Sequence, residues 1–156
     1  MMEFFEDAPI EQRVAFLTAI AHLARADGNF DDDEKDFFID LAKLYKLSKE
    51  EARETIKIRN DDEVLEIVRQ ITDKGLALVL IREMFYLGYE DGDLSDSEIV
   101  FISKVGIALN ISIDKMEEIS SWVIRGIEWE EEGDEIFYDF DEEDETAEVD
   151  LNEFDV

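Results

Sequence analysis

The sequence predicts an all-α fold of about seven helices. Apolar residues recur at intervals of three and four along most of the chain, which is the spacing of one helix face. Only seven glycines and one proline occur among 156 residues, too few for a turn-rich β protein. Because 46% of the residues are hydrophobic, the chain can bury a core of about one domain.

Turn residues and apolar stripes divide the chain into successive helices. A helix should start at Pro9, which fits the first helical position, and end at Gly28. Two Ser-x-x-Glu capping boxes, at Ser48 and Ser95, mark the starts of two others. The segments expected to be helical are 9–27, 31–46, 48 onward, 60–71, 75–90, 95–109 and 112–132.

The pattern also predicts which side chains face inward. Between residues 76 and 89 only Arg82 and Glu83 are charged, which places that helix in the middle of a bundle. The single histidine, His22, is expected to be a half-buried packing residue. The other side chains expected to pack inward or on a flank are Phe37, Phe38, Leu41, Leu44, Ile99, Ile102, Trp122 and Trp129.

One acidic phrase occurs twice, 64 residues apart. Residues 27–34 read Asp-Gly-Asn-Phe-Asp-Asp-Asp-Glu, and residues 91–98 read Asp-Gly-Asp-Leu-Ser-Asp-Ser-Glu. Each copy lies between two apolar helical patterns. This duplication predicts two equivalent helical hairpins, packed by pseudo-twofold symmetry into a four-helix core with flanking helices.

The two acidic turns are the candidate functional sites. Asp27 and Asp91 would lie at the negative end of a helix dipole, an unfavourable place for a carboxylate. A short turn brings further acids close, so each turn could gather oxygen ligands for a hard cation such as Ca²⁺ or Mg²⁺. The predicted metal ligands are Asp27, Asp31 and Glu34 in the first turn, and Asp91, Asp93 and Glu98 in the second.

Helix capping alone offers a second explanation of the same residues. Ser95-x-x-Glu98 is a capping box, and Asp31-x-x-Glu34 can cap a helix in the same way. Capping leaves Asp27, Asp91 and Asp93 unexplained. The turns also lack the glycine and glutamate spacing of an EF-hand loop.

Net charge restricts the partners. With 44 acidic and 15 basic residues, the formal charge is −29. Such a surface repels nucleic acid and anionic lipid and favours cations and basic protein surfaces. No apolar run approaches the length of a membrane span, and no signal peptide is evident, so a cytoplasmic location without membrane insertion is expected.

The chain is expected to divide near residue 133. Residues 1–132 should form the helical bundle, whereas residues 133–156 hold 12 acids and no bases and form an acidic tail, part of it disordered. Apolar residues within the tail, such as Phe140 and Phe154, leave docking of part of it on the bundle or on a partner as the alternative.

The acidic turns resemble those of the TerB family of tellurite-resistance and stress-response proteins. The resemblance covers about residues 10–130. It rests on Leu-Ala-Arg-Ala-Asp-Gly at 23–28 with Glu34, and on the stretch from Gly88 to Glu98. It implies a cytoplasmic all-helical bundle with acidic metal sites at the six residues named above. Glu90 replaces the alanine that would match Ala26, and the acidic tail is outside the family pattern.

Two functions follow from these observations. The first is a non-enzymatic, divalent-cation-binding module in a tellurite or stress response. The alternative is a protein-interaction adaptor whose acidic surface and tail bind a basic partner, with the turns serving only as helix caps. An enzyme is disfavoured because no activated nucleophile or phosphate-binding glycine loop is recognisable.

Overall fold

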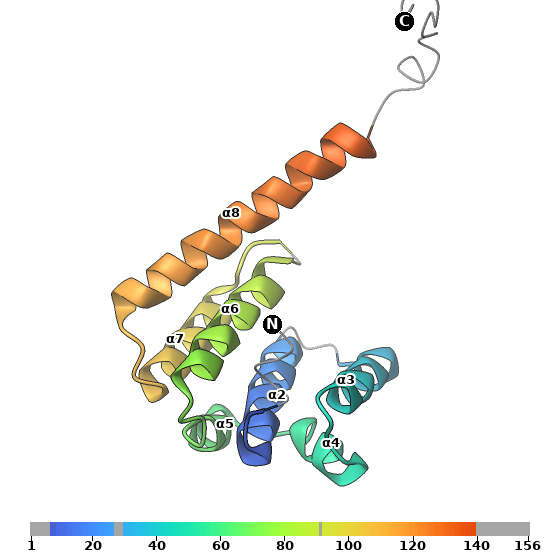
Figure 1. The fold of residues 1–156 in the computed structure, drawn as a ribbon, viewed down its shortest axis with the longest axis vertical. Helices are drawn as coiled ribbons and strands as arrows, with labels where there is room; N and C mark the ends of the chain where they lie inside the picture. The colour runs from blue at the N-terminus through green and yellow to red at the C-terminus, as the bar shows by residue number, and fades with distance from the viewer. Residues whose placement is uncertain (1–6, 27–29, 91, 140–156) are drawn as a thin grey trace, which may run out of the picture.

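A computed structural model describes residues 7–26, 30–90 and 92–139, and all of the regular structure in these residues is α-helical. The predicted all-α fold of about seven helices is confirmed (Figure 1). The helices in the described part are α2 (Ile10–Arg25), α3 (Asp32–Leu44), α4 (Lys49–Thr55), α5 (Asp61–Val68), α6 (Lys74–Glu90), α7 (Asp96–Ala108) and α8 (Ile113–Phe137).

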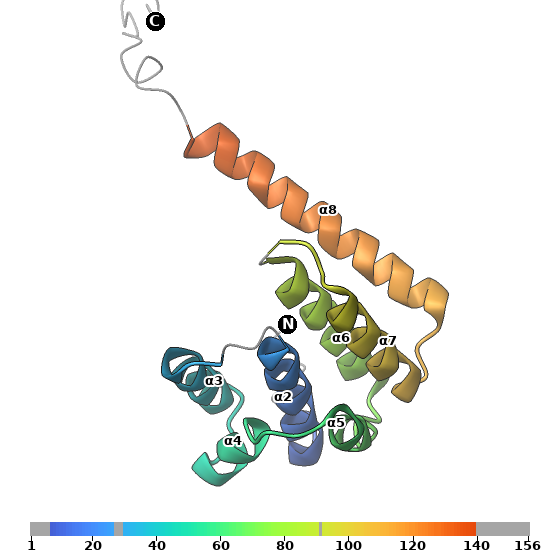
Figure 2. The same ribbon diagram turned by 180° about the vertical axis from the view of Figure 1, so that it is seen from behind.

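Helix α2 occupies the centre of the bundle. It packs against α4, α5 and α6, while α3 packs against α4, and α6 also contacts α7 and α8. Figures 1 and 2 accordingly show α3 and α4 on one side of α2, and α6, α7 and α8 on the other. The pseudo-twofold relation between the two hairpins stays a prediction.

The core is built mainly from α2 and α6. Phe16, Leu17 and Leu23 of α2 are fully buried, as are Leu80 and Met84 of α6. The central position predicted for residues 75–90 is therefore confirmed. Burial of each large apolar side chain contributes about 1.5–3 kcal/mol, so these two helices dominate the cohesion of the bundle.

Local capping follows the sequence closely. The side chains of Ser48, Asn60, Ser95 and Ser112 each accept a hydrogen bond from the backbone N–H three residues later. The boxes at Ser48 and Ser95 are complete, since the glutamate also accepts from the cap residue's N–H. Pro9 precedes the first turn of α2 instead of occupying it.

Several side chains that the sequence predicted to face inward are exposed. They are Phe37, Leu44, Ile99, Trp122 and Trp129. Helical periodicity identifies an apolar face but not whether another element covers it. Helix α3 packs through Phe38 and Ala42, and α7 packs through Phe101 and Ile102, which leaves the adjacent apolar residues in solvent.

Helix α8 extends beyond the bundle. It runs for 25 residues and ends at Phe137, further than the predicted end near Glu132. Its last turns lie clear of every other helix in Figures 1 and 2. Division of the chain near residue 133 stays a prediction, and residues 140–156 lie outside the described part. None of the helices described is both long and apolar enough to cross a membrane.

A buried polar contact ties α2 to the start of α6. The Gln12 amide donates to Thr72 Oγ1 at 3.0 Å, and its oxygen accepts from the N–H groups of Thr72 and Asp73 at 3.3 and 3.1 Å. Asp73 in turn accepts from the Leu76 N–H at 2.8 Å. Gln12 therefore satisfies backbone donors where α6 begins, a role that no local sequence pattern indicates.

We expect Gln12→Ala to lower the free energy of unfolding by about 0.5–1.5 kcal/mol, because it removes the acceptor of the Thr72 and Asp73 N–H groups. Urea denaturation followed by circular dichroism measures this loss. Glu11→Ala, at the neighbouring exposed position of α2, is the matched control and should change stability little. Equal effects of the two substitutions would contradict the structural role of Gln12.

Candidate cation site at the acidic turns

The six predicted metal ligands fall into two groups. Asp27 and Asp91 lie outside the described residues, so their geometry stays a prediction. Asp31 and Glu34 lie at the start of α3, Asp93 precedes α7, and Glu98 lies in the first turn of α7. Within residues 7–26, 30–90 and 92–139, no cluster of three or more acidic or histidine side chains could hold a metal ion.

In the second turn, Glu98 is fully accounted for by helix capping. Its Oε1 accepts from the Ser95 N–H at 3.2 Å and from the Ser95 hydroxyl at 2.8 Å. The hydroxyl oxygen accepts from the Glu98 N–H at 3.2 Å, which closes the box. The Glu98 side chain packs against Gly88 in the last turn of α6, because a Cβ there would lie 3.4 Å from Oε2.

In the first turn, capping accounts for only half of the arrangement. Asp31 Oδ1 accepts from the Glu34 N–H at 2.8 Å. The Glu34 carboxylate does not return a bond to Asp31, so the expected reciprocal cap is not formed. Glu34 Oε2 is instead buried and has no hydrogen-bond partner. A buried acceptor left unsatisfied costs about 1–3 kcal/mol, and more when it is charged.

One residue difference explains why the two turns diverge. Ser95 has a hydroxyl proton to donate to Glu98, whereas Asp31 at the matching position is a carboxylate with nothing to donate. Asp31 and Glu34 also carry like charges, which repel. Among the described residues, the first turn is therefore the one whose glutamate lacks hydrogen-bond donors for its buried oxygen.

Basic side chains line a cavity beside the first turn. The cavity has a volume of about 620 Å³, and its walls include Arg25 at the end of α2, Lys35 in the first turn of α3, and Arg59. Burial lowers the pKa of the Arg25 guanidinium, and the charge of Arg59 lowers it further. Arg25 lies 4.4 Å over the Phe30 ring and donates to the Ile56 carbonyl.

The sequence does not predict this basic cavity, because the residues that line it come from four separate segments. The one available signal was Arg25, two residues before Asp27 in the first acidic motif. His22 lines the same cavity, packs 4.9 Å from the Phe101 ring and lies 2.7 Å from Asp61. It is half-buried, as predicted.

The helical bundle with acidic turns before α3 and α7 defines a class of small all-α domain. A family model described as tellurite resistance protein TerB matches residues 13–121. The match spans most of the chain, and the protein belongs to the TerB family. No curated protein and no solved structure matches the chain.

The two glutamates should respond oppositely to neutralisation. In the presence of a chelator, Glu98→Gln should lower the free energy of unfolding by about 1 kcal/mol, because it weakens charge-assisted capping bonds. Glu34→Gln should leave stability unchanged or raise it, since it removes a buried and unsatisfied charge. Urea titrations of the two variants measure the difference, and an equal loss in both would contradict the asymmetry.

Proposed function

We propose that this TerB-family chain is a non-enzymatic module that binds a divalent cation, and that its principal site is the first acidic turn. The observation that carries the proposal is the Glu34 carboxylate, whose Oε2 is buried without a hydrogen-bond donor. Carboxylate oxygens are the ligands that Ca²⁺ and Mg²⁺ prefer. Asp31 supplies a second carboxylate within the same turn, and Asp27 is the third ligand in this proposal.

Because of the large negative net charge, cation binding should stabilise the folded state. Self-repulsion among an excess of 29 negative charges destabilises a compact state. A ligand that binds only the folded chain adds about 2.7 kcal/mol of stability when its free concentration is about 100 times the dissociation constant. The cation concentration would thereby set the free energy of unfolding of the domain. This dependence is consistent with a module in a tellurite or stress response.

Isothermal titration of the chain with Ca²⁺, Mg²⁺ and Mn²⁺ tests the proposal. We expect saturable binding of at least one of these ions, and Glu34→Gln should weaken it by about tenfold or more because a ligand oxygen loses its charge. The same ion should raise the melting temperature of the unmodified chain and raise that of the variant less.

Glu63→Gln is the matched control. Glu63 occupies the same third position of a helix whose first turn also carries three acids, and its N–H is capped by Asn60. Its side chain is exposed, unlike that of Glu34. Unaltered affinity in this variant would support a defined site. Equal weakening in both variants would reduce the binding to general surface charge, and the absence of any saturable heat would refute the proposal.

A second function, an adaptor for a basic partner, is supported by an independent observation. The outer face of α8 carries exposed tryptophans, although the sequence predicted that these would be covered. Acidic residues predominate around Trp129, since residues 126–139 hold seven acids and no bases, whereas Trp122 shares a cavity with Arg82, Lys115 and Arg125. Aromatic side chains are enriched at the centres of protein interfaces, and an acidic rim favours partners of opposite charge.

A further inference from the structure

Helix α8 uses only its inner side to hold the fold. Val123 is its one buried residue in the described part, and Met116, Ile119 and Ile127 pack more loosely against the core. A hydrogen bond between the Tyr89 and Ser120 hydroxyls, and one that the Tyr86 hydroxyl donates to Glu130, join α6 to the same side. Most of the remaining circumference of this long helix is exposed, although Trp122 lines a cavity together with Leu78 and Arg82 of α6.

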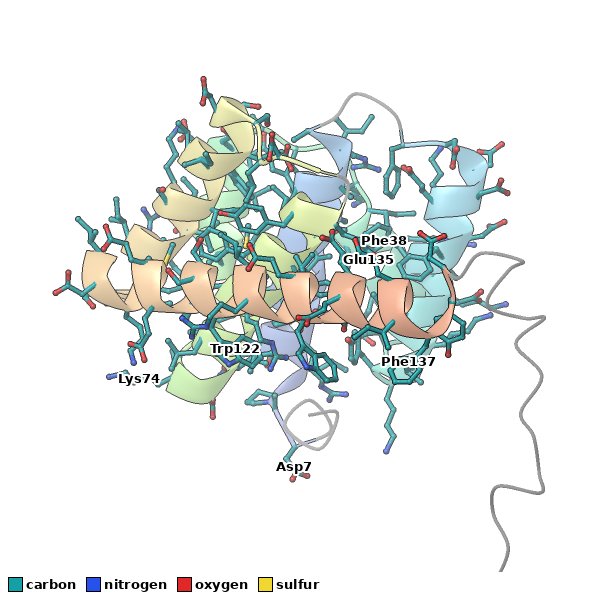
Figure 3. All side chains as sticks on the ribbon, turned by 90° about the horizontal axis from the view of Figure 1, so that it is seen from above. Asp7, Phe38, Lys74, Trp122, Glu135 and Phe137 are labelled. Carbon is teal, nitrogen blue, oxygen red and sulfur yellow. The ribbon has the colours of Figure 1, made fainter. Side chains whose placement is uncertain are left out.

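The outer side carries large apolar residues at an interval of seven. Trp122, Trp129 and Ile136 are 57%, 75% and 62% exposed. Because seven residues make nearly two helical turns, these side chains line up along one face. Phe137, also exposed, extends this face, and Figure 3 shows it projecting from the same side of α8 as Trp122. We refer to Trp122, Trp129, Ile136 and Phe137 as the outer stripe.

Two glycines alternate with the large residues of the outer stripe. Gly126 and Gly133 follow Trp122 and Trp129 by four residues each, which completes the heptad spacing of a helix-pairing seam. A glycine inside a helix costs about 1 kcal/mol relative to alanine. A Cβ at either position would meet nothing within 4 Å, so the protein's own packing does not require them.

Two glycines in other helices, Gly88 and Gly106, have an internal explanation. A Cβ at Gly88 would lie 2.9 Å from Leu94, and one at Gly106 would lie 2.6 Å from Met116. Gly126 and Gly133 differ because the space above them is open. A seam that alternates tryptophan with glycine presents projections and gaps, and such a surface receives the side chains of another helix.

Charge selects among the helices that could fill this seam. A second copy of the chain would bring another net charge of −29 to a face that is already acidic around Trp129 and Ile136. The chain's own residues 140–156 contain nine acids and no bases, so they would add the same repulsion. A partner helix with basic flanks would instead be attracted to the acidic segment of α8 at residues 126–139.

We propose that the outer stripe is the docking face for a basic amphipathic helix of a partner protein, seated with its apolar side chains over Gly126 and Gly133. This inference rests on the adaptor function and is independent of cation binding. It specifies the surface and the partner chemistry: leucine-like residues at heptad spacing, flanked by lysine or arginine.

Peptides of leucine and lysine, about three heptads long, test the proposal. One peptide places leucine at the heptad positions, and a second has the same composition in scrambled order. Binding of the labelled peptides to the full chain is followed by fluorescence anisotropy at physiological salt with a chelator present. The heptad peptide should bind at least about tenfold more tightly than the scrambled one, because only it forms an apolar face.

Substitutions then locate the binding surface. Trp122→Ala combined with Trp129→Ala should weaken heptad-peptide binding by about tenfold or more without changing the net charge. Ile113→Ala is the control, since Ile113 is exposed on the same helix at its opposite end and outside the stripe. If the double variant binds as the unmodified chain does, the docking face is refuted but an acidic adaptor survives. If neither peptide binds, the adaptor function fails as well.

Acrylamide quenching of the full chain decides whether the outer stripe is already occupied. Trp122 and Trp129 are the chain's only two tryptophans, so the fluorescence reports on the stripe directly. Free access at all protein concentrations supports the proposal. Shielding that is independent of concentration would assign the stripe to the chain's own tail, and shielding that grows with concentration would assign it to a second copy. Either result would overturn docking of a basic partner.

Discussion

The burial of α2 against α4, α5 and α6 is the constraint on which the whole molecule depends. A chain with a net charge of −29 repels itself, so apolar contact has to hold the helices together. Phe16, Leu17 and Leu23 of α2 provide that contact from the centre, and Gln12 fixes the start of α6 relative to it. Because α2 ends where the first acidic turn begins, the same packing positions Asp31, Glu34 and the basic cavity beside them.

The sequence predicted what depends on local structure and missed what depends on distant segments. Helix class, the capping boxes at Ser48 and Ser95, and the central place of α6 follow from spacing within a few residues, and all three predictions are confirmed. The prediction that Trp122 and Trp129 are covered was wrong, because periodicity does not reveal which face finds a partner. The contacts of Gln12 and the lining of the basic cavity involve segments far apart in sequence, so no short sequence pattern predicts them.

The duplicated acidic phrase does not produce two equal turns. Serine at position 95 lets Glu98 complete a cap, whereas the first turn, with aspartate at position 31, leaves Glu34 Oε2 buried without a hydrogen-bond partner. A change from hydroxyl to carboxylate at one matching position thus separates a structural turn from a candidate cation turn. The outer stripe of α8 lies on another part of the molecule. It concerns the binding of a partner protein and not the binding of a cation. The two proposals can therefore succeed or fail separately.

The most direct test of the central claim is nuclear magnetic resonance of the isotope-labelled chain during titration with Mn²⁺, a paramagnetic ion that broadens nearby amide signals. The amides of Glu34 and Lys35 should broaden first, ahead of those of Ser97 and Glu98 in the second turn and of Glu63 at the start of α5. Broadening spread evenly over the acidic surface, or reaching Glu63 together with Glu34, would contradict a defined site at the first turn.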